Sequence, residues 1–433
     1  MTSDSSKEVI IIGGGMSGLG AGIKLQEQGF NCTILEAQPE AGGLAGFFTV
    51  QNKYFPLGYH HILYQDEPLI ATLKKMGLYS QVVWKKGRVL FAVNNKVYDL
   101  TNPLDFIRFP LPWLDKLRFV KLMGFCLLKN DWESVTEDAR TWLTRIAGPK
   151  VREVVFDPLM DIKYGLGPEH LSASWIGSRL HYQEFSKPLG FIPGTDWTKL
   201  LVDALIANFK KLGGKIFLNA PAQKITASNS AYTGVEYKDS YGTVHSIPSA
   251  ILLNTAPPHI FLSLSPFPEP QLEKITYLDA LSLILETDQK LPRELYMLAC
   301  LNPRYSFGGI FALSSLNPTL GVHGGTVLNF FTTLTPKYEH LRHTPSEKLL
   351  ELYQADFEKL FGFKVKPLWH HLTLVKNYSP RFLKDYKNPD CRSKTHGIYF
   401  AGNYLTHPAI TSTGSALASG EKAADCILQD YAG

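Results

Sequence analysis

Three glycines near the N-terminus have the spacing of a phosphate-binding turn. Gly13, Gly15 and Gly18 follow directly after an apolar run at residues 9–12, which is typical of a buried parallel strand. Gly13 would permit the tight turn, Gly15 would let the backbone approach a pyrophosphate, and Gly18 would let a helix pack closely on the strand. That helix would present unpaired N–H groups and the positive end of its dipole to phosphates. The spacing therefore predicts the start of a dinucleotide-binding βαβ unit.

An acidic residue completes this unit. Residues 19–28 are expected to form the helix, and residues 31–35 the second strand, which runs into Glu36. Glu36 lies 18 residues after Gly18, where a carboxylate can accept hydrogen bonds from both ribose hydroxyls. A carboxylate there disfavours the 2′-phosphate of NADP, so the pattern predicts FAD or NAD.

An ordered set of further segments resembles the flavin amine oxidase superfamily, in particular its protoporphyrinogen oxidase and phytoene desaturase branch. Residues 35–37 (LEA) and 42–45 (GGLA) are similar to the second glycine motif of that branch. Other similar segments are residues 190–194 (GFIPG), 211–216 (KLGGKI), 219–225, 253–258 (LNTAPP), 397–403 (GIYFAGN) and 416–424 (ALASGEKAA). The resemblance is strong over roughly the first 65 residues, residues 190–258 and about the last 40, and it implies FAD rather than NAD.

The resemblance also implies which residues bind the cofactor. They are Gly13, Gly15, Met16, Ser17, Gly18, Glu36, Ala37, Gly43, Leu44, Gly58, Tyr59, His60, Ala222, Ala256, Gly402, Asn403, Ser415 and Ala416. Four positions depart from the usual pattern. Gln38 and Leu44 stand where arginines are usual, Asn403 where an acid is usual, and Ser415 where a glycine is usual. These departures argue against an amine oxidase in the narrow sense but leave flavin binding intact.

Three residues are candidates for catalysis. His60 and His61 lie in the loop at residues 55–61, which matches the family loop that passes near the flavin ring. His61 could bind substrate or steer protons, and the alternative is that one histidine contacts the cofactor through its backbone while the other packs. Lys163 could line a buried cleft or carry a surface charge. Tyr378 could stand beside the flavin or belong to an aromatic core.

Residues 102–130 mix bulky apolar side chains with basic ones. Phe106, Trp113, Leu114 and Phe125 are interleaved with Arg108, Lys116, Arg118, Lys121 and Lys129. Such a segment can enter the interface of an anionic bilayer, and the alternative is a helix that caps a substrate domain.

Composition narrows the function classes. Hydrophobic residues make up 45% and charged residues 19%, which is ordinary for a globular protein, and the net charge of +5 argues against nucleic acid as a partner. No apolar run is long enough to span a membrane, no secretory signal is visible, and no metal-ligand spacing occurs. The five cysteines are scattered along the chain and are expected to be reduced thiols, as in a cytoplasmic protein. Through residues 102–130 the protein could also contact the inner face of a membrane peripherally.

The predicted fold class is α/β. A Rossmann-type doubly wound FAD-binding domain would comprise residues 1–66, 190–258 and 393–433. An inserted α+β substrate-binding domain would comprise residues 67–189 and 259–392, helical in its first part, with a mixed sheet and a helix near residues 346–361 in its second.

The expected activity is FAD-dependent removal of hydride from a bulky apolar substrate such as a porphyrinogen, polyene or lipid. Because a second dinucleotide fingerprint is absent, electrons would leave to oxygen, a quinone or a partner protein. One alternative is a flavin amine oxidase. Another is an isomerase resembling UDP-galactopyranose mutase, which would need Arg179, Arg293 or Arg304 to clamp a pyrophosphate. A third is a non-catalytic protein resembling Rab GDP-dissociation inhibitors, against which the intact flavin motifs argue.

Overall fold

A five-stranded parallel sheet forms one end of the molecule. A computed structural model describes residues 7–181, 187–301 and 305–431 of the chain. The strand order is β10-β2-β1-β14-β20, and the strands are β1 (Glu8–Ile12), β2 (Asn31–Leu35), β10 (Lys215–Phe217), β14 (Ile251–Asn254) and β20 (Ile398–Phe400). The order along the chain differs from the order in the sheet, so the sheet is assembled from distant segments. The predicted α/β fold class is confirmed.

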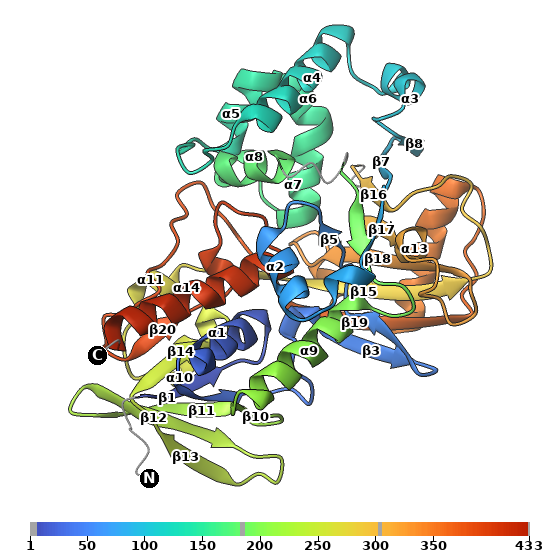
Figure 1. The fold of residues 1–433 in the computed structure, drawn as a ribbon. Helices are drawn as coiled ribbons and strands as arrows, with labels where there is room; N and C mark the ends of the chain where they lie inside the picture. Colours follow the sequence, from blue (N-terminus) through green and yellow to red (C-terminus); the bar gives the residue numbers. More distant parts are fainter. Residues whose placement is uncertain (1–6, 182–186, 302–304, 432–433) are drawn as a thin grey trace.

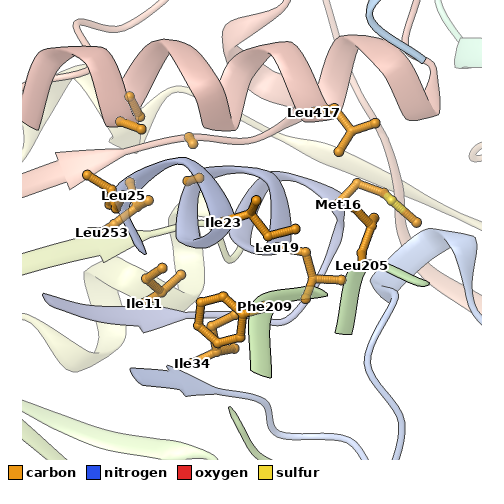
Figure 2. Packing of buried hydrophobic residues seen from close by; sticks show 14 of the residues in the cluster. Ile11, Met16, Leu19, Ile23, Leu25, Ile34, Leu205, Phe209, Leu253 and Leu417 are labelled. Atoms are coloured by element: carbon orange, nitrogen blue, oxygen red, sulfur yellow. The ribbon is translucent and has the colours of Figure 1, made fainter. Parts of the chain in front are cut away.

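Both faces of this sheet are covered, which explains why its strands are continuously apolar. Three helices, α1 (Met16–Glu27), α9 (Trp197–Lys211) and α14 (Thr413–Tyr431), cover one face (Figure 1). Ile11 and Ile34 of the sheet pack against Leu19, Phe209 and other apolar side chains from these helices (Figure 2). The other face packs against an antiparallel meander of β11 (Ala222–Ser228), β12 (Ala231–Lys238) and β13 (Val244–Pro248). A strand buried on both faces needs no polar alternation.

A seven-stranded mixed sheet lies beside the parallel sheet. Its order is β19-β15-β18-β17-β16-β7-β8, with β7 (Val89–Val93), β8 (Lys96–Tyr98), β15 (Tyr277–Thr287), β16 (Met297–Cys300), β17 (Gly309–Ala312), β18 (Thr326–Thr333) and β19 (Trp369–Pro380). Helix α13 (Ser346–Phe361) packs on one face. The other face carries Phe311 and Phe331, in a cluster that also contains Phe55 and Tyr59. This second face therefore brings aromatic side chains to the N-terminal segment.

A helical lobe lies at the far end from the parallel sheet (Figure 1). It contains α3 (Pro103–Arg108), α4 (Trp113–Leu128), α5 (Ala139–Ala147), α6 (Pro149–Val151), α7 (Asp157–Tyr164) and α8 (Ala173–His181), with a π-helical turn at Arg152–Phe156. The remaining elements are β3 (Phe47–Val50), β4 (Lys53–Pro56), β5 (Ile62–Leu63), α2 (Glu67–Lys75), β6 (Val83–Lys85), β9 (Leu189–Phe191), α10 (Pro258–Leu264), α11 (Pro270–Glu273) and α12 (Leu313–Leu316).

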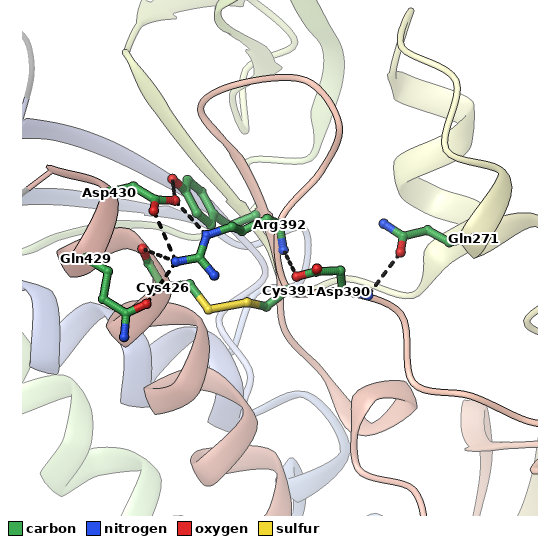
Figure 3. The surroundings of a disulfide bond; sticks show 8 residues. Gln271, Asp390, Cys391, Arg392, Cys426, Gln429 and Asp430 are labelled. Atoms are coloured by element: carbon green, nitrogen blue, oxygen red, sulfur yellow. Dashed lines mark hydrogen bonds and ion pairs between the residues drawn. A yellow bond between two sulfur atoms is a disulfide. The ribbon is translucent and has the colours of Figure 1, made fainter.

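Two sequence expectations need correction. Strands β6, β7 and β8 interrupt the segment expected to be helical, because Val89 to Ala92 supply a buried apolar run that pairs with β16. Cys391 and Cys426 form a disulfide, so these two cysteines are not the free thiols that were expected. The bond joins the loop before β20 to α14 beside the ion pair of Arg392 with Asp430 (Figure 3). Cys32, Cys126 and Cys300 are free and buried.

The proposed division into two domains stays a prediction. None of the helices in the described residues is both long and apolar enough to cross a membrane.

Candidate cofactor and substrate site

The first glycine turn leaves no room for side chains. Gly13 has φ +104°, and its N–H donates a hydrogen bond of 2.9 Å to the carbonyl of Leu35. A Cβ added to Gly18 would lie 2.1 Å from the carbonyl oxygen of Gly13, so only glycine lets α1 approach β1 this closely. Gly15 caps α1 without a side-chain hydrogen bond, and the first turn of the helix carries no acidic residue. The N-terminus of α1 therefore keeps backbone donors for an anion.

The second glycine loop lies against the first. The N–H of Gly42 donates to the carbonyl of Gly14 over 2.9 Å, and Gly42 and Gly15 form a parallel bridge. A Cβ added to Gly43 would lie 3.3 Å from the Cα atom of Gly15. The two loops thus present bare backbone to each other and to the N-terminus of α1. This side-chain-free cradle fits the pyrophosphate of a dinucleotide.

Glu36 is held rigidly at the carboxyl end of β2. It is 8% exposed, and its carboxylate oxygens accept hydrogen bonds from the N–H groups of Gly14 (2.7 Å) and Gln38 (2.8 Å). A carboxylate has about four acceptor sites, so lone pairs remain for ribose hydroxyls. Ala37 follows it directly. Ala256 lies after β14, where its carbonyl accepts from the side chain of Asn254, and Ala222 begins β11.

The C-terminal motif contacts the N-terminal one. The hydroxyl of Ser17 donates to the carbonyl of Ala416 over 2.7 Å. Gly402 has φ +144°, and its N–H donates to the hydroxyl of Ser419 over 3.0 Å. Asn403 accepts a 2.6 Å hydrogen bond from the hydroxyl of Tyr277. The bond from Ser17 joins the two ends of the chain, and the other two hold the C-terminal motif in place.

Ser415 has a local role in addition to any cofactor contact. The N–H of Ser415 donates to the hydroxyl of Ser412, and the hydroxyl of Ser415 accepts from the N–H of Ser412. This reciprocal pair caps α14 at the position where the family pattern has glycine.

The loop of Gly58, Tyr59 and His60 is tied to the second glycine loop. His60 Nε2 donates to the carbonyl of Leu44 over 3.0 Å. Burial, reinforced by the nearby His61, lowers the pKa of His60 to about 4, although the bond to Leu44 opposes that shift. His60 is therefore neutral at pH 7 and acts as a donor to the backbone. A Cβ added to Gly58 would lie 3.4 Å from the ring of Phe331.

Tyr59 and Tyr378 belong to an aromatic wall on the mixed sheet. The rings of Tyr59 and Phe311 stack with centroids 3.6 Å apart, and the rings of Phe331 and Tyr378 meet edge to face at 4.9 Å. The hydroxyls of Tyr59 and Tyr378 lie 3.3 Å apart. Burial raises the pKa of Tyr378 well above its ordinary value, and Tyr59 adds to the rise. Tyr378 therefore keeps its proton at neutral pH.

His61 stands at the edge of this wall. Its Nδ1 lies within hydrogen-bond distance, 2.8 Å, of the hydroxyl of Tyr296, and its ring faces that of Tyr59 with centroids 6.3 Å apart. The structure thus brings His61 and Tyr378 to the same aromatic cluster.

Lys163 lies on α7 behind the wall. Its ammonium is 5.3 Å from the ring centroid of Trp175 and 5.8 Å from that of Tyr164. Tyr164 and Arg179 both influence the pKa of Tyr378, so the part of α7 that carries Lys163 lies near the wall. Arg293 pairs with Asp105 in the region of α3, and Arg304 lies outside the described residues.

Sequence reasoning missed three members of the wall. Phe311 and Phe331 lie on β17 and β18, and Tyr296 lies directly before β16. These segments carry no motif, so only the aromatic character of the residues could have marked them. The assignment of individual residues to cofactor binding and catalysis stays a proposal.

Helices α3 and α4 expose a large apolar surface, here called the α3–α4 face. Of the nineteen large hydrophobic side chains that are exposed in the described part of the chain, nine lie within residues 102–130. They are Leu104, Ile107, Trp113, Leu114, Leu117, Val120, Phe125, Leu127 and Leu128. The surface of a soluble monomeric protein rarely has so many exposed large hydrophobic side chains in one region. Lys116 is not part of this face, because it is buried and donates to the carbonyl of Ile107 over 2.8 Å.

Comparison with known proteins gives a family and a fold. Residues 16–428 match the family described as flavin containing amine oxidoreductase. The chain is 23% identical over 475 residues to the 15-cis-phytoene desaturase of Narcissus pseudonarcissus, an alignment that covers 98% of this chain and 80% of the relative. It is 31% identical over 140 residues to amine oxidase [flavin-containing] B of Sus scrofa, which covers 31% of this chain and 24% of the relative. A solved structure from Exiguobacterium sp. 255-15, named as a candidate protoporphyrinogen oxidase, superposes with a TM-score of 0.77 at 19% identity and covers 98% of this chain and 99% of its own.

Proposed function

The chain belongs to the flavin containing amine oxidoreductase family and is an FAD-dependent oxidoreductase, and on that premise we propose that it removes hydride from a bulky, apolar organic substrate. The aromatic wall of Tyr59, Phe311, Phe331 and Tyr378 carries this proposal. It packs in one cluster with Leu44 of the second glycine motif, and its buried rings would form the apolar wall of the substrate site. Porphyrinogens and polyenes have the flat or extended apolar shape that such a surface binds.

The residues around the wall would orient the substrate and exclude water. Tyr378 stays protonated and can donate a hydrogen bond without carrying charge. His61, paired with Tyr296, could accept or relay the proton that a neighbouring atom of the substrate loses when the hydride is removed from the C–H bond. FAD, held by the cradle of Gly13, Gly15 and Gly43, would accept the hydride and pass both electrons later to oxygen, a quinone or a partner protein.

The α3–α4 face supports a second element of the proposal, which is peripheral contact with a membrane. Transfer of an apolar substrate from a bilayer into water costs about 0.8 kcal/mol for each CH₂ that becomes exposed. An enzyme that binds the substrate at the bilayer surface avoids this free-energy cost, because the substrate does not pass through water. Leu117 is 66% exposed and Leu114 69%, while Lys121 and Lys129 flank the same helix. Apolar side chains rimmed by cations are typical of helices that lie in a lipid interface.

Anaerobic flavin reduction tests the activity. Purified FAD-loaded protein would be mixed with porphyrinogens, polyenes and amines, and bleaching of the flavin absorbance would be followed. We expect reduction by an apolar substrate, slowed in Phe311→Ala, and no rapid reduction by NADH or NADPH. Reduction by primary amines alone would instead support amine oxidation, the second candidate, which the partial likeness to an amine oxidase favours.

Vesicle flotation tests the membrane contact. Leu117→Ser combined with Val120→Ser should reduce binding to phosphatidylglycerol-containing vesicles. The matched control, Leu352→Ser with Leu368→Ser, removes exposed apolar side chains elsewhere and should leave binding unchanged. Equal binding of both double variants would refute a role for the α3–α4 face.

A further inference from the structure

A cavity of about 680 Å³ lies beside the α3–α4 face. It is bounded by β8, α3, the segment at residues 292–293 and the end of α13. Its lining residues are Lys96, Val97, Tyr98, Asp105, Arg108, Pro292, Arg293, Leu360 and Phe361. A smaller cavity of about 410 Å³ shares Asp105, Arg108 and Arg293 with it. The two cavities form one recess around α3, called the α3 recess below.

The α3 recess contains more basic side chains than acidic ones. Arg293 Nη1 lies 2.8 Å from the carboxylate of Asp105 and 3.2 Å from the carbonyl of Val97, so its orientation is fixed. Arg88 lies 3.6 Å from the carboxylates of both Asp99 and Glu294. All three acids of the recess therefore have a basic partner.

Lys96 and Arg108 are the cations of the recess that have no carboxylate of the described chain within ion-pair distance, although Arg108 is close enough to Asp105 to help lower the pKa of that carboxyl. Both side chains are exposed, both line the larger cavity, and neither forms an ion pair within the described residues. They stand on different elements, β8 and α3, so the cavity lies between them. Two cations that line one cavity from different elements suit an anion with several oxygen acceptors, and a guanidinium matches the geometry of phosphate in particular.

The position of Arg108 connects the recess to the apolar surface. Arg108 follows Ile107 and comes one helical turn after Leu104, and these two side chains are 49% and 62% exposed. Leu104 also lines the smaller cavity. The cationic recess thus borders the α3–α4 face directly. This arrangement is complementary to a bilayer surface, where the apolar side chains would meet acyl chains and the cations would meet phosphates.

We propose that the α3 recess binds the headgroup phosphate of an anionic phospholipid, with Lys96 and Arg108 as the residues that contact it. This site would fix the orientation of the enzyme on the membrane, because it lies at one edge of the α3–α4 face. The inference rests on the proposed membrane contact and adds a chemical preference to it. Basic residues spread over a surface respond to charge alone, whereas a formed recess distinguishes phosphate from another anion.

The test compares two kinds of vesicle with equal surface charge. One contains phosphatidylcholine with phosphatidylglycerol, and the other contains phosphatidylcholine with oleate, whose charge is a carboxylate. The FAD-loaded wild type should bind the phosphatidylglycerol vesicles several-fold more tightly. Lys96→Gln combined with Arg108→Gln should lose this preference and bind these vesicles roughly tenfold or more weakly, since each cation near a lipid surface contributes about a fivefold factor.

Two controls separate the recess from general electrostatics. Lys211→Gln with Lys215→Gln removes the same charge from exposed positions on the parallel-sheet end, and it should retain both the affinity and the preference. Lys121→Gln should weaken binding to both kinds of vesicle by the same factor, because that lysine lies on α4 outside the recess. The visible flavin spectrum should be identical in all variants.

The remaining outcomes contradict the inference in distinguishable ways. Equal binding of wild type to both vesicle types would overturn the headgroup site but leave the membrane contact standing. Saturable binding of inorganic phosphate without vesicles, abolished in the recess variant and accompanied by no vesicle preference, would assign the recess to a free phosphate compound instead. Absence of vesicle binding by the wild type would refute the membrane contact and the headgroup site together.

Discussion

The hydroxyl of Ser17 donates a hydrogen bond of 2.7 Å to the carbonyl of Ala416, across a separation of 399 residues. The bond joins the N-terminus of α1, which forms part of the pyrophosphate cradle, to the first turn of α14. A Cβ added to Gly420 would lie 2.1 Å from the carbonyl oxygen of Ser17, so the two helices are also in close backbone contact here. The proposed site for FAD therefore forms only when both ends of the chain have folded together.

Ser17→Ala should lower the free energy of unfolding of the protein by about 1 kcal/mol, because it removes a part-buried hydrogen bond that links α1 to α14. Thermal unfolding with and without FAD measures the effect, and the affinity for FAD should also fall. Ser246→Ala, at an exposed position on β13, is the control and should change neither. An unchanged melting temperature in Ser17→Ala would show that the bond contributes nothing to the helix pair.

Glu36→Ala should weaken FAD binding by about 1.5–3 kcal/mol, since a charged acceptor for the ribose hydroxyls is lost. This corresponds to roughly a tenfold to hundredfold rise in Kd, measurable by titrating the apoprotein with FAD. Glu40→Ala removes the same charge from an exposed position four residues away and should leave Kd unchanged. Equal Kd values for the two variants would contradict the assigned role of Glu36.

Gly18→Ala should abolish FAD binding or prevent folding, because its Cβ would overlap the carbonyl of Gly13. Gly124→Ala is the matched change, since no atom lies within 4 Å of its added Cβ. It should stabilise α4 by up to about 1 kcal/mol. Circular dichroism and flavin absorbance distinguish the two results, and a fully loaded, stable Gly18→Ala protein would refute the close packing of α1 on β1.

Acidification should destabilise the fold through His60. Burial lowers its pKa from 6.5 to about 4, so between these values the unfolded chain binds a proton that the folded chain does not. The free energy of unfolding should therefore be unaffected by this group above pH 6.5 and fall by up to about 3 kcal/mol as the pH drops to 4. His60→Gln keeps a donor for Leu44 and should flatten the pH dependence of denaturant midpoints. Parallel curves for wild type and variant would contradict the shift.

The disulfide between Cys391 and Cys426 predicts a thiol count. Protein denatured without reductant should show three reactive thiols, and with reductant five. Cys391→Ser should lower the free energy of unfolding by about 4 kcal/mol, because the bond closes a loop of 35 residues. In the presence of reductant, the free energy of unfolding of the wild type should fall by the same amount. Five reactive thiols without reductant would show that the bond does not form in the purified protein.

The sequence by itself determined the parts of the fold that depend on local patterns. The run at residues 9–12, the glycine spacing and the acid at position 36 specify β1, the turn, α1 and β2, because each step is fixed by neighbours within a few residues. The helix expected near residues 346–361 coincides with α13. The mixed sheet expected in the same part of the chain is present, but the bounds and the order of β15 and β18 were not predicted.

Only the tertiary structure decided which side chains meet. Tyr59 stacks on Phe311 and Tyr378 approaches Tyr59 because β17 and β19 flank β15 and β18 in the mixed sheet, and strand order depends on contacts between residues far apart in sequence. The cavity between Lys96 and Arg108 and the pairing of Cys391 with Cys426 have the same origin. A one-dimensional pattern fixes the period of a strand or helix, whereas the choice of neighbour is set by the burial of whole faces, which no local window contains.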